Sequence, residues 1–129
     1  PRGGGPGGLG VGDGIGGTKQ DGRIESLGGD VILVGQLDRS QIDEVVKRNL
    51  TAIRYCYQRE LQKDASLAGK VTMKFTISGD GTVSAARASG SLQSDAVQSC
   101  MTGRFLKMRF PEPRGHGIVV VSYPFLFGT

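Results

Sequence analysis

The sequence predicts an α+β domain in which two helices pack on one face of a small, mainly antiparallel sheet, in the order β-α-β-β-α-β. Three observations lead to this prediction. Apolar residues recur at helical spacing in two segments, and apolar and polar residues alternate in a third. Of the 22 glycines, 13 lie in the first 30 residues, where neither pattern occurs. We therefore expect a flexible linker over residues 1–29 and one domain over residues 30–129.

The first strand and the first helix follow the predicted linker. Residues 31–34 are apolar, largely β-branched and bounded by glycines nearby, which is typical of a short strand. Asp38 or Ser40 can cap the helix that comes next. Its apolar residues lie three or four positions apart and predict one continuous core helix of about six turns. These residues are Ile42, Val46, Leu50, Ile53, Tyr57 and Leu61.

A change to alternating periodicity then predicts a β-hairpin. In the strand expected over residues 70–78, the apolar side chains of Val71, Met73, Phe75 and Ile77 share one face. The pair Asp80-Gly81 favours a tight turn. A returning strand rich in small residues is expected over residues 82–89.

A second helix and a last strand complete the pattern. Ser94 or Asp95 opens the helix, which we expect to run to about Met108, before two prolines. The last strand is expected over residues 118–127 and is unusually apolar. Pro124 lies inside it and has no N–H to donate, which predicts that this side of the strand lies at a sheet edge.

Two cysteines, Cys56 and Cys100, fall on the apolar sides of the two predicted helices. Their spacing does not match the C-x-x-C pattern of redox and zinc sites. Two interpretations are open: a pair of buried free thiols, or one disulfide across the contact between the helices, which is the pairing we expect. A disulfide would indicate an oxidising compartment such as the periplasm.

The predicted domain is basic. Residues 39–129 contain thirteen basic and seven acidic residues, a net charge of +6 within a chain total of +4. This excess could attract an anionic partner, but the basic residues are interspersed and tryptophan is absent. Most aromatic residues occupy positions that the pattern buries, with Tyr55 between Arg54 and Arg59 as an exception. We therefore do not expect nucleic acid as a partner.

The sequence also argues against an enzyme, a cofactor site and a metal site. Its single histidine, His116, lies in a glycine-rich loop near Glu112 with no obvious partnered serine. Asp43 and Glu44 belong to the start of a helix, where they favour the helix dipole. The glycine motif at residues 12–17 lacks the preceding strand and following helix that a dinucleotide site requires.

Several motifs occur in order over about residues 31–127. They are Asn49-Leu50, Ile53-Arg54-Tyr55-Cys56-Tyr57, Glu60-Leu61-Gln62-Lys63, Leu67-Ala68-Gly69-Lys70-Val71, Asp80-Gly81-Thr82-Val83, Cys100, Met108-Arg109-Phe110-Pro111 and Tyr123-Pro124-Phe125. Together they resemble the AgmX/PglI C-terminal domain, a myxobacterial branch of the TonB C-terminal domain family. One departure is Gly115-His116-Gly117, where the family would have an all-glycine loop.

The resemblance implies a protein anchored in the inner membrane by a helix upstream of this chain, with this domain at the end of a periplasmic linker. TonB-like domains add a strand from an outer-membrane partner to their sheet edge and transmit force from an inner-membrane motor. The implied function is a coupling module of an envelope-spanning or gliding-motility machine. The alternative is a structural envelope module that binds peptidoglycan or oligomerises.

The last strand is the predicted partner-binding edge, because an exposed edge offers unpaired N–H and C=O groups for strand addition. The residues expected there are Val119, Val121, Tyr123, Phe125 and Phe127. The alternative is that this strand lies inside the sheet or pairs with residues 31–34. An open edge could also support a homodimer, formed by strand exchange through residues 31–34.

Overall fold

The computed structural model describes residues 22–26 and 30–128. Its strands are β1 (Arg23–Ser26), β2 (Ile32–Val34), β3 (Gly69–Ile77), β4 (Val83–Ser89) and β5 (Val119–Gly128). Its helices are α1 (Arg39–Arg48), α2 (Leu50–Leu61) and α3 (Asp95–Leu106), and a short 3₁₀ turn covers Arg114–His116.

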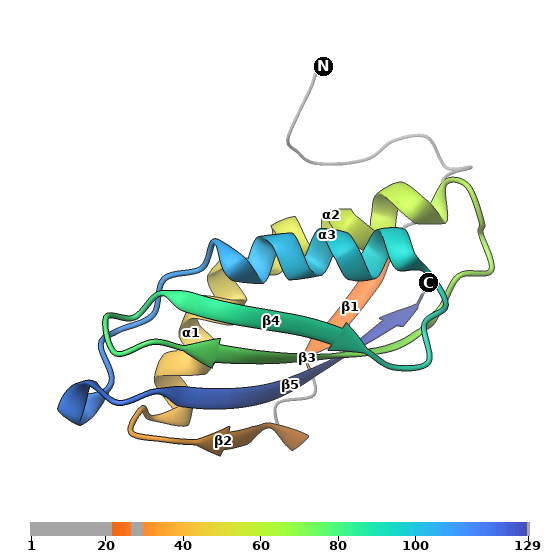
Figure 1. The fold of residues 1–129 in the computed structure, drawn as a ribbon. Helices are drawn as coiled ribbons and strands as arrows, with labels where there is room; N and C mark the ends of the chain where they lie inside the picture. The colour runs from red at the N-terminus through yellow and green to blue at the C-terminus, as the bar shows by residue number, and fades with distance from the viewer. Residues whose placement is uncertain (1–21, 27–29, 129) are drawn as a thin grey trace.

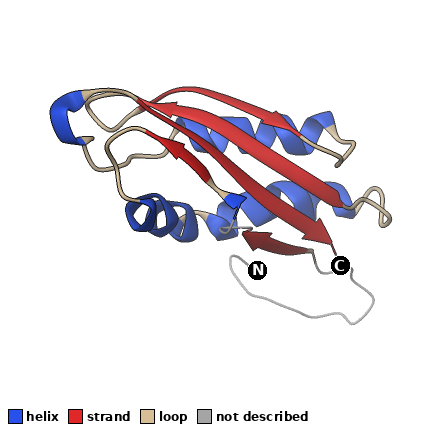
Figure 2. Ribbon diagram, turned by 90° about the horizontal axis from the view of Figure 1, so that it is seen from below, coloured by secondary structure: helices blue, strands red, loops and turns tan. Residues whose placement is uncertain are grey.

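The strands form one antiparallel sheet with the helices packed against it, which confirms the predicted fold class. The strand order is β1-β5-β3-β4, and β2 also pairs with β5. Helices α2 and α3 lie side by side over the sheet in Figure 1, and Figure 2 shows the strands from below. The predicted hairpin is the pair β3 and β4, and Ser94 caps α3 by accepting a hydrogen bond from the amide of Val97 at 3.2 Å.

The alternation along β3 separates a buried face from an open one. Val71, Met73, Phe75 and Ile77 are fully or almost fully buried and pack toward the helices. The ring of Phe75, for example, lies 5.0 Å from that of Phe105 in α3. On the other side, Lys70 and Lys74 are exposed. We call this second side the open face, because it carries the side chains that point away from the buried core.

The long helix predicted from Ile42 to Leu61 is two helices, because the chain breaks at Asn49. There the backbone leaves helical geometry, with φ −104° and ψ 2°. The Asn49 side-chain amide donates to the carbonyl of Val45 at 2.8 Å, while its backbone N–H donates to Val46 at 3.0 Å. The side chain thus takes the acceptor that the helical N–H would use. The apolar spacing continues across the break, so periodicity did not reveal it.

The prediction of a flexible linker over residues 1–29 is wrong for residues 23–26, which form β1 and pair with the end of β5. The rest of that prediction, residues 1–21 and 27–29, lies outside the described residues. The N–H of Gly22 donates to the Gln58 side chain at 2.6 Å, and Arg54 donates to the carbonyl of Gly22 at 3.1 Å. Ile24 packs against the core and is the one apolar residue in this strand.

Tyr57 joins α2 to the start of β3. Its ring is fully buried, 4.9 Å from the ring of Phe127, and its hydroxyl donates a hydrogen bond to the carbonyl of Leu67. Burial raises the pKa of the Tyr57 hydroxyl above its ordinary value. The neutral hydroxyl is therefore the form that stabilises the fold.

Replacing Tyr57 with phenylalanine should lower the free energy of unfolding by roughly 1–3 kcal/mol, because the Leu67 carbonyl loses its donor. Unfolded chains ionise tyrosine near pH 10, below the raised pKa of the folded state, so the contribution of Tyr57 is complete below about pH 10. It then declines as the pH rises through the folded-state pKa. Urea unfolding of wild type and Tyr57→Phe at pH 8 and 10.5 should give the larger difference at pH 8. Equal differences would contradict a buried hydroxyl.

Candidate strand-addition site

The five residues predicted to form the partner-binding edge lie inside the sheet. Their side chains are at most 1% exposed; they are Val119, Val121, Tyr123, Phe125 and Phe127. On one side β5 pairs with β3 over nine residues, and on the other it pairs with β2 and then with β1. The prediction that β5 is an exposed edge is therefore wrong. The alternative, an inner strand that pairs with β2, describes the structure.

Pro124 marks a local gap in this pairing. On the side away from β3, β2 pairs with residues 120–122 and β1 with residues 125–128, so Tyr123 and Pro124 lie between them. A residue without an N–H is tolerated where no ladder bond is made. Pro124 therefore indicated an unpaired position correctly, but the position is a gap two residues long and not a whole edge.

The outer edge of the sheet is β4, which pairs with β3 alone. In an antiparallel strand, the N–H and C=O of one residue point to the same side, and those of the next residue to the opposite side. The carbonyl of Lys70 points toward the β4 side, since it accepts from the amide of Leu92 at 3.2 Å. By alternation Lys74 also points that way, and its partner Arg87 points back toward it.

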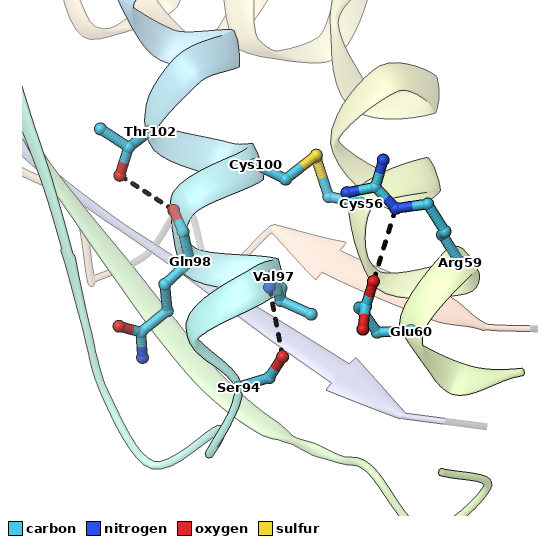
Figure 3. The surroundings of a disulfide bond; sticks show 8 residues. All are labelled: Cys56, Arg59, Glu60, Ser94, Val97, Gln98, Cys100 and Thr102. Atoms are coloured by element: carbon cyan, nitrogen blue, oxygen red, sulfur yellow. Dashed lines mark hydrogen bonds and ion pairs between the residues drawn. A yellow bond between two sulfur atoms is a disulfide. The ribbon is translucent and has the colours of Figure 1, made fainter. Parts of the chain in front are cut away.

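The backbone groups of Ala86 and Ala88 therefore point away from β3, out of the sheet. They border a groove of about 400 Å³ between β4 and α3. The groove is lined by Ala86, Arg87, Ala88, Gln98, Ser99 and Thr102. Figure 3 shows that Gln98 and Thr102 project from the side of α3 opposite the disulfide. Of these residues, the two alanines of the strand are small, and the three residues of the helix are polar and uncharged.

At one end of the β4 edge, another segment of the same chain already pairs with the backbone. Arg109 pairs antiparallel with Thr82, and the amide of Phe110 donates to the carbonyl of Gly81 at 2.9 Å. Gly81 has φ +90°, and a Cβ there would meet the Phe110 carbonyl oxygen at 2.2 Å, so only glycine allows this approach. Hydrogen bonds from the side chain and backbone of Thr82 lower the pKa of the Asp80 carboxyl and fix the turn.

The disulfide fixes the position of α3, the helix that lines one side of the groove. Cys56 in α2 and Cys100 in α3 are joined, with their Cα atoms 5.6 Å apart (Figure 3). Cys56 is fully buried, and Cys100 packs partly against the core. Because Cys100 lies between Ser99 and Thr102, this bond ties the groove-lining turn of α3 to α2.

Among the described residues, no group of three or more His, Cys, Asp and Glu side chains is placed to hold a metal ion. His116 is exposed, and its Nδ1 lies 3.7 Å from a Glu112 oxygen and 3.4 Å from the carbonyl of Gly79. A larger hollow of about 860 Å³ lies beside β1 and the end of β5, with Arg23, Glu25 and Arg54 in its walls. Within the described residues, no helix is both long and apolar enough to cross a membrane.

No family model, curated protein or solved structure matches this chain. The edge of β4 and its groove were not predicted from the sequence. The small residues of this strand were visible, but which strand becomes the edge depends on pairing between distant segments.

Amide hydrogen exchange should alternate along β4. The amides of Ala85, Arg87 and Ser89 point toward β3 and should exchange slowly, while those of Ala86 and Ala88 should exchange fast. Exchange followed by NMR at single residues measures this directly. Equal protection of Ala86 and Arg87 would show that the edge is not free.

Replacing both cysteines with serine (C56S/C100S) should lower the free energy of unfolding by about 4 kcal/mol. The bond closes a loop of 44 residues and so reduces the entropy of the unfolded chain. Urea unfolding of the variant and of wild type, with and without reductant, measures the loss. Reduced wild type is the matched control and should resemble the variant. A loss below about 1 kcal/mol would contradict a stabilising cross-link between α2 and α3.

Proposed function

We propose that this domain binds an extended segment of a partner protein, which adds as a strand to the outer edge of β4. The observation that carries the proposal is the pair of outward-facing backbone groups at Ala86 and Ala88 beside the groove under α3. Main-chain hydrogen bonds to an edge strand supply affinity that depends little on sequence, and a neighbouring pocket adds selectivity. The antiparallel pairing of Arg109 with Thr82 supports an antiparallel direction for the added strand.

The resemblance to the AgmX/PglI C-terminal domain supports a cellular setting for this binding. We propose a periplasmic coupling module at the C-terminal end of an inner-membrane-anchored protein, as part of an envelope-spanning or gliding-motility machine. Its partner would be an outer-membrane or periplasmic protein, and the region upstream would connect it to an inner-membrane motor. The disulfide Cys56–Cys100 is compatible with an oxidising compartment.

The proposal is tested by titrating the isotope-labelled, oxidised protein with peptides from the periplasm-facing ends of outer-membrane barrels. NMR shifts should concentrate on residues 84–89 and 98–102, and exchange at Ala86 and Ala88 should slow. Shifts confined to β1 and β5 would mean that a partner strand displaces β1 instead. Shifts spread over the basic surface, or none with any peptide, would count against strand addition.

The variant Ala88→Pro should abolish this binding while the domain still folds. Proline at this position removes an N–H that points out of the sheet and breaks no bond to β3. Ala88→Ser is the matched control, because it keeps the N–H and should bind as wild type does. Circular dichroism checks that both variants are folded. Undiminished binding by a folded Ala88→Pro protein would rule out this edge.

A further inference from the structure

We infer that Arg87 selects partners that carry an aspartate or glutamate, placed opposite it on the open face. The inference rests on the proposed strand addition and adds the chemical class of the segment that is bound. Arg87 is exposed, and its cross-strand partner on β3 is Lys74, which is also exposed. Because directly paired side chains share one face, two positive charges lie side by side there.

The register of an added strand follows from the free backbone groups. An antiparallel strand that bonds to both Ala86 and Ala88 places its intervening residue directly opposite Arg87. This is a non-hydrogen-bonded pair, in which Cα atoms approach to about 4.5 Å and side chains are closest. The side chain of that residue points to the open face, as Arg87 does. Its two neighbours point instead toward Gln98, Ser99 and Thr102 in the groove.

The charges around this position favour a carboxylate. Lys74 lies across from Arg87, and Lys70 lies further along the same face of β3. Neither Arg87 nor Lys74 forms an ion pair with another described residue. The acidic residue of the open face, Glu25, is opposite Leu126, so β5 and β3 separate it from β4. Opposite charges in a cross-strand pair stabilise it, and like charges destabilise it.

The same geometry disfavours a second copy of this chain as the occupant. In an antiparallel pair of two β4 strands, the register that satisfies Ala86 and Ala88 on both chains pairs Arg87 with Arg87. Two guanidinium groups would then meet in a close, non-hydrogen-bonded pair. On the groove side, the two neighbouring residues of the added strand would meet Gln98, Ser99 and Thr102, which are polar and uncharged. The expected segment therefore has one acidic residue between two uncharged ones.

A tethered probe tests the inference in the full chain. The last strand, β5, ends at Gly128. A strand added to β4 would lie three strand spacings from β5, which is about 15 Å. A linker of about 15 glycine and serine residues spans this distance. The linker is appended after Thr129 and carries the strand Thr-Val-Glu-Val-Thr-Val-Thr. Two further probes have glutamine or lysine in place of glutamate. The docked fraction is measured from the exchange protection of Ala86 and Ala88.

The expected order of docking is glutamate, glutamine, lysine, with each step changing the docking equilibrium about two- to fivefold. In Arg87→Glu the order should reverse. Arg104→Glu, which makes the same charge change on an exposed residue of α3 outside the groove lining, should keep the wild-type order. About 0.5 M salt should reduce the differences in docking between the three probes, but it should not abolish docking.

Equal docking of all three probes, or an order that Arg87→Glu leaves unchanged, would overturn selection by Arg87 while strand addition stands. Reversal in Arg104→Glu would also overturn it, because net charge and not position would then decide. If no probe protects Ala86 and Ala88, strand addition at β4 is overturned together with the inference.

Discussion

The ladder between β3 and β5 is the constraint on which the rest of this domain depends. Nine residue pairs join the two strands, from Gly69 opposite Phe127 to Ile77 opposite Val119. A slip of one residue in either strand would turn its buried side chains to the open face. The aligned side chains of Phe75 and Val121 instead lie on one surface, against which the helices pack. Both helices of the disulfide, α2 and α3, therefore depend on this register for their position.

The ladder also determines where the sheet has edges. Since β5 uses its second side for β1 and β2, the sheet ends there in strands of four and three residues. Very short strands are one way in which proteins protect a sheet edge from unwanted pairing. At the opposite end, β4 has seven residues, and Arg109 pairs with Thr82, which lies just before the first of them. β4 is thus the longest edge strand among the described residues, and its outward-facing backbone groups at Ala86 and Ala88 lie beside the groove under α3.

Local patterns in the sequence predicted most of the elements, though not β1 or the break at Asn49, and they did not predict the order in which the strands pair. The alternation from Val71 to Ile77 and the Asp80-Gly81 turn specify a hairpin wherever it lies, because both signals act over a few residues. The apolar character of β5 is equally compatible with an edge that binds a partner and with an inner strand buried on one face. Only non-local pairing distinguishes them. The candidate site could not be predicted for the same reason, since Ala86 and Ala88 are edge residues only once β5 is central.

Arg87 shows how one edge can be both protected and selective. A proline or an inward-pointing charge would exclude every incoming strand, because it removes a donor or cannot be buried. An exposed arginine on the open face leaves the outward backbone groups of its neighbours available. It disfavours strands with a cation in the opposing position, including a second β4, and favours those with a carboxylate. On the proposed mode of binding, the side chain that keeps this domain from pairing with itself is the one that chooses its partner.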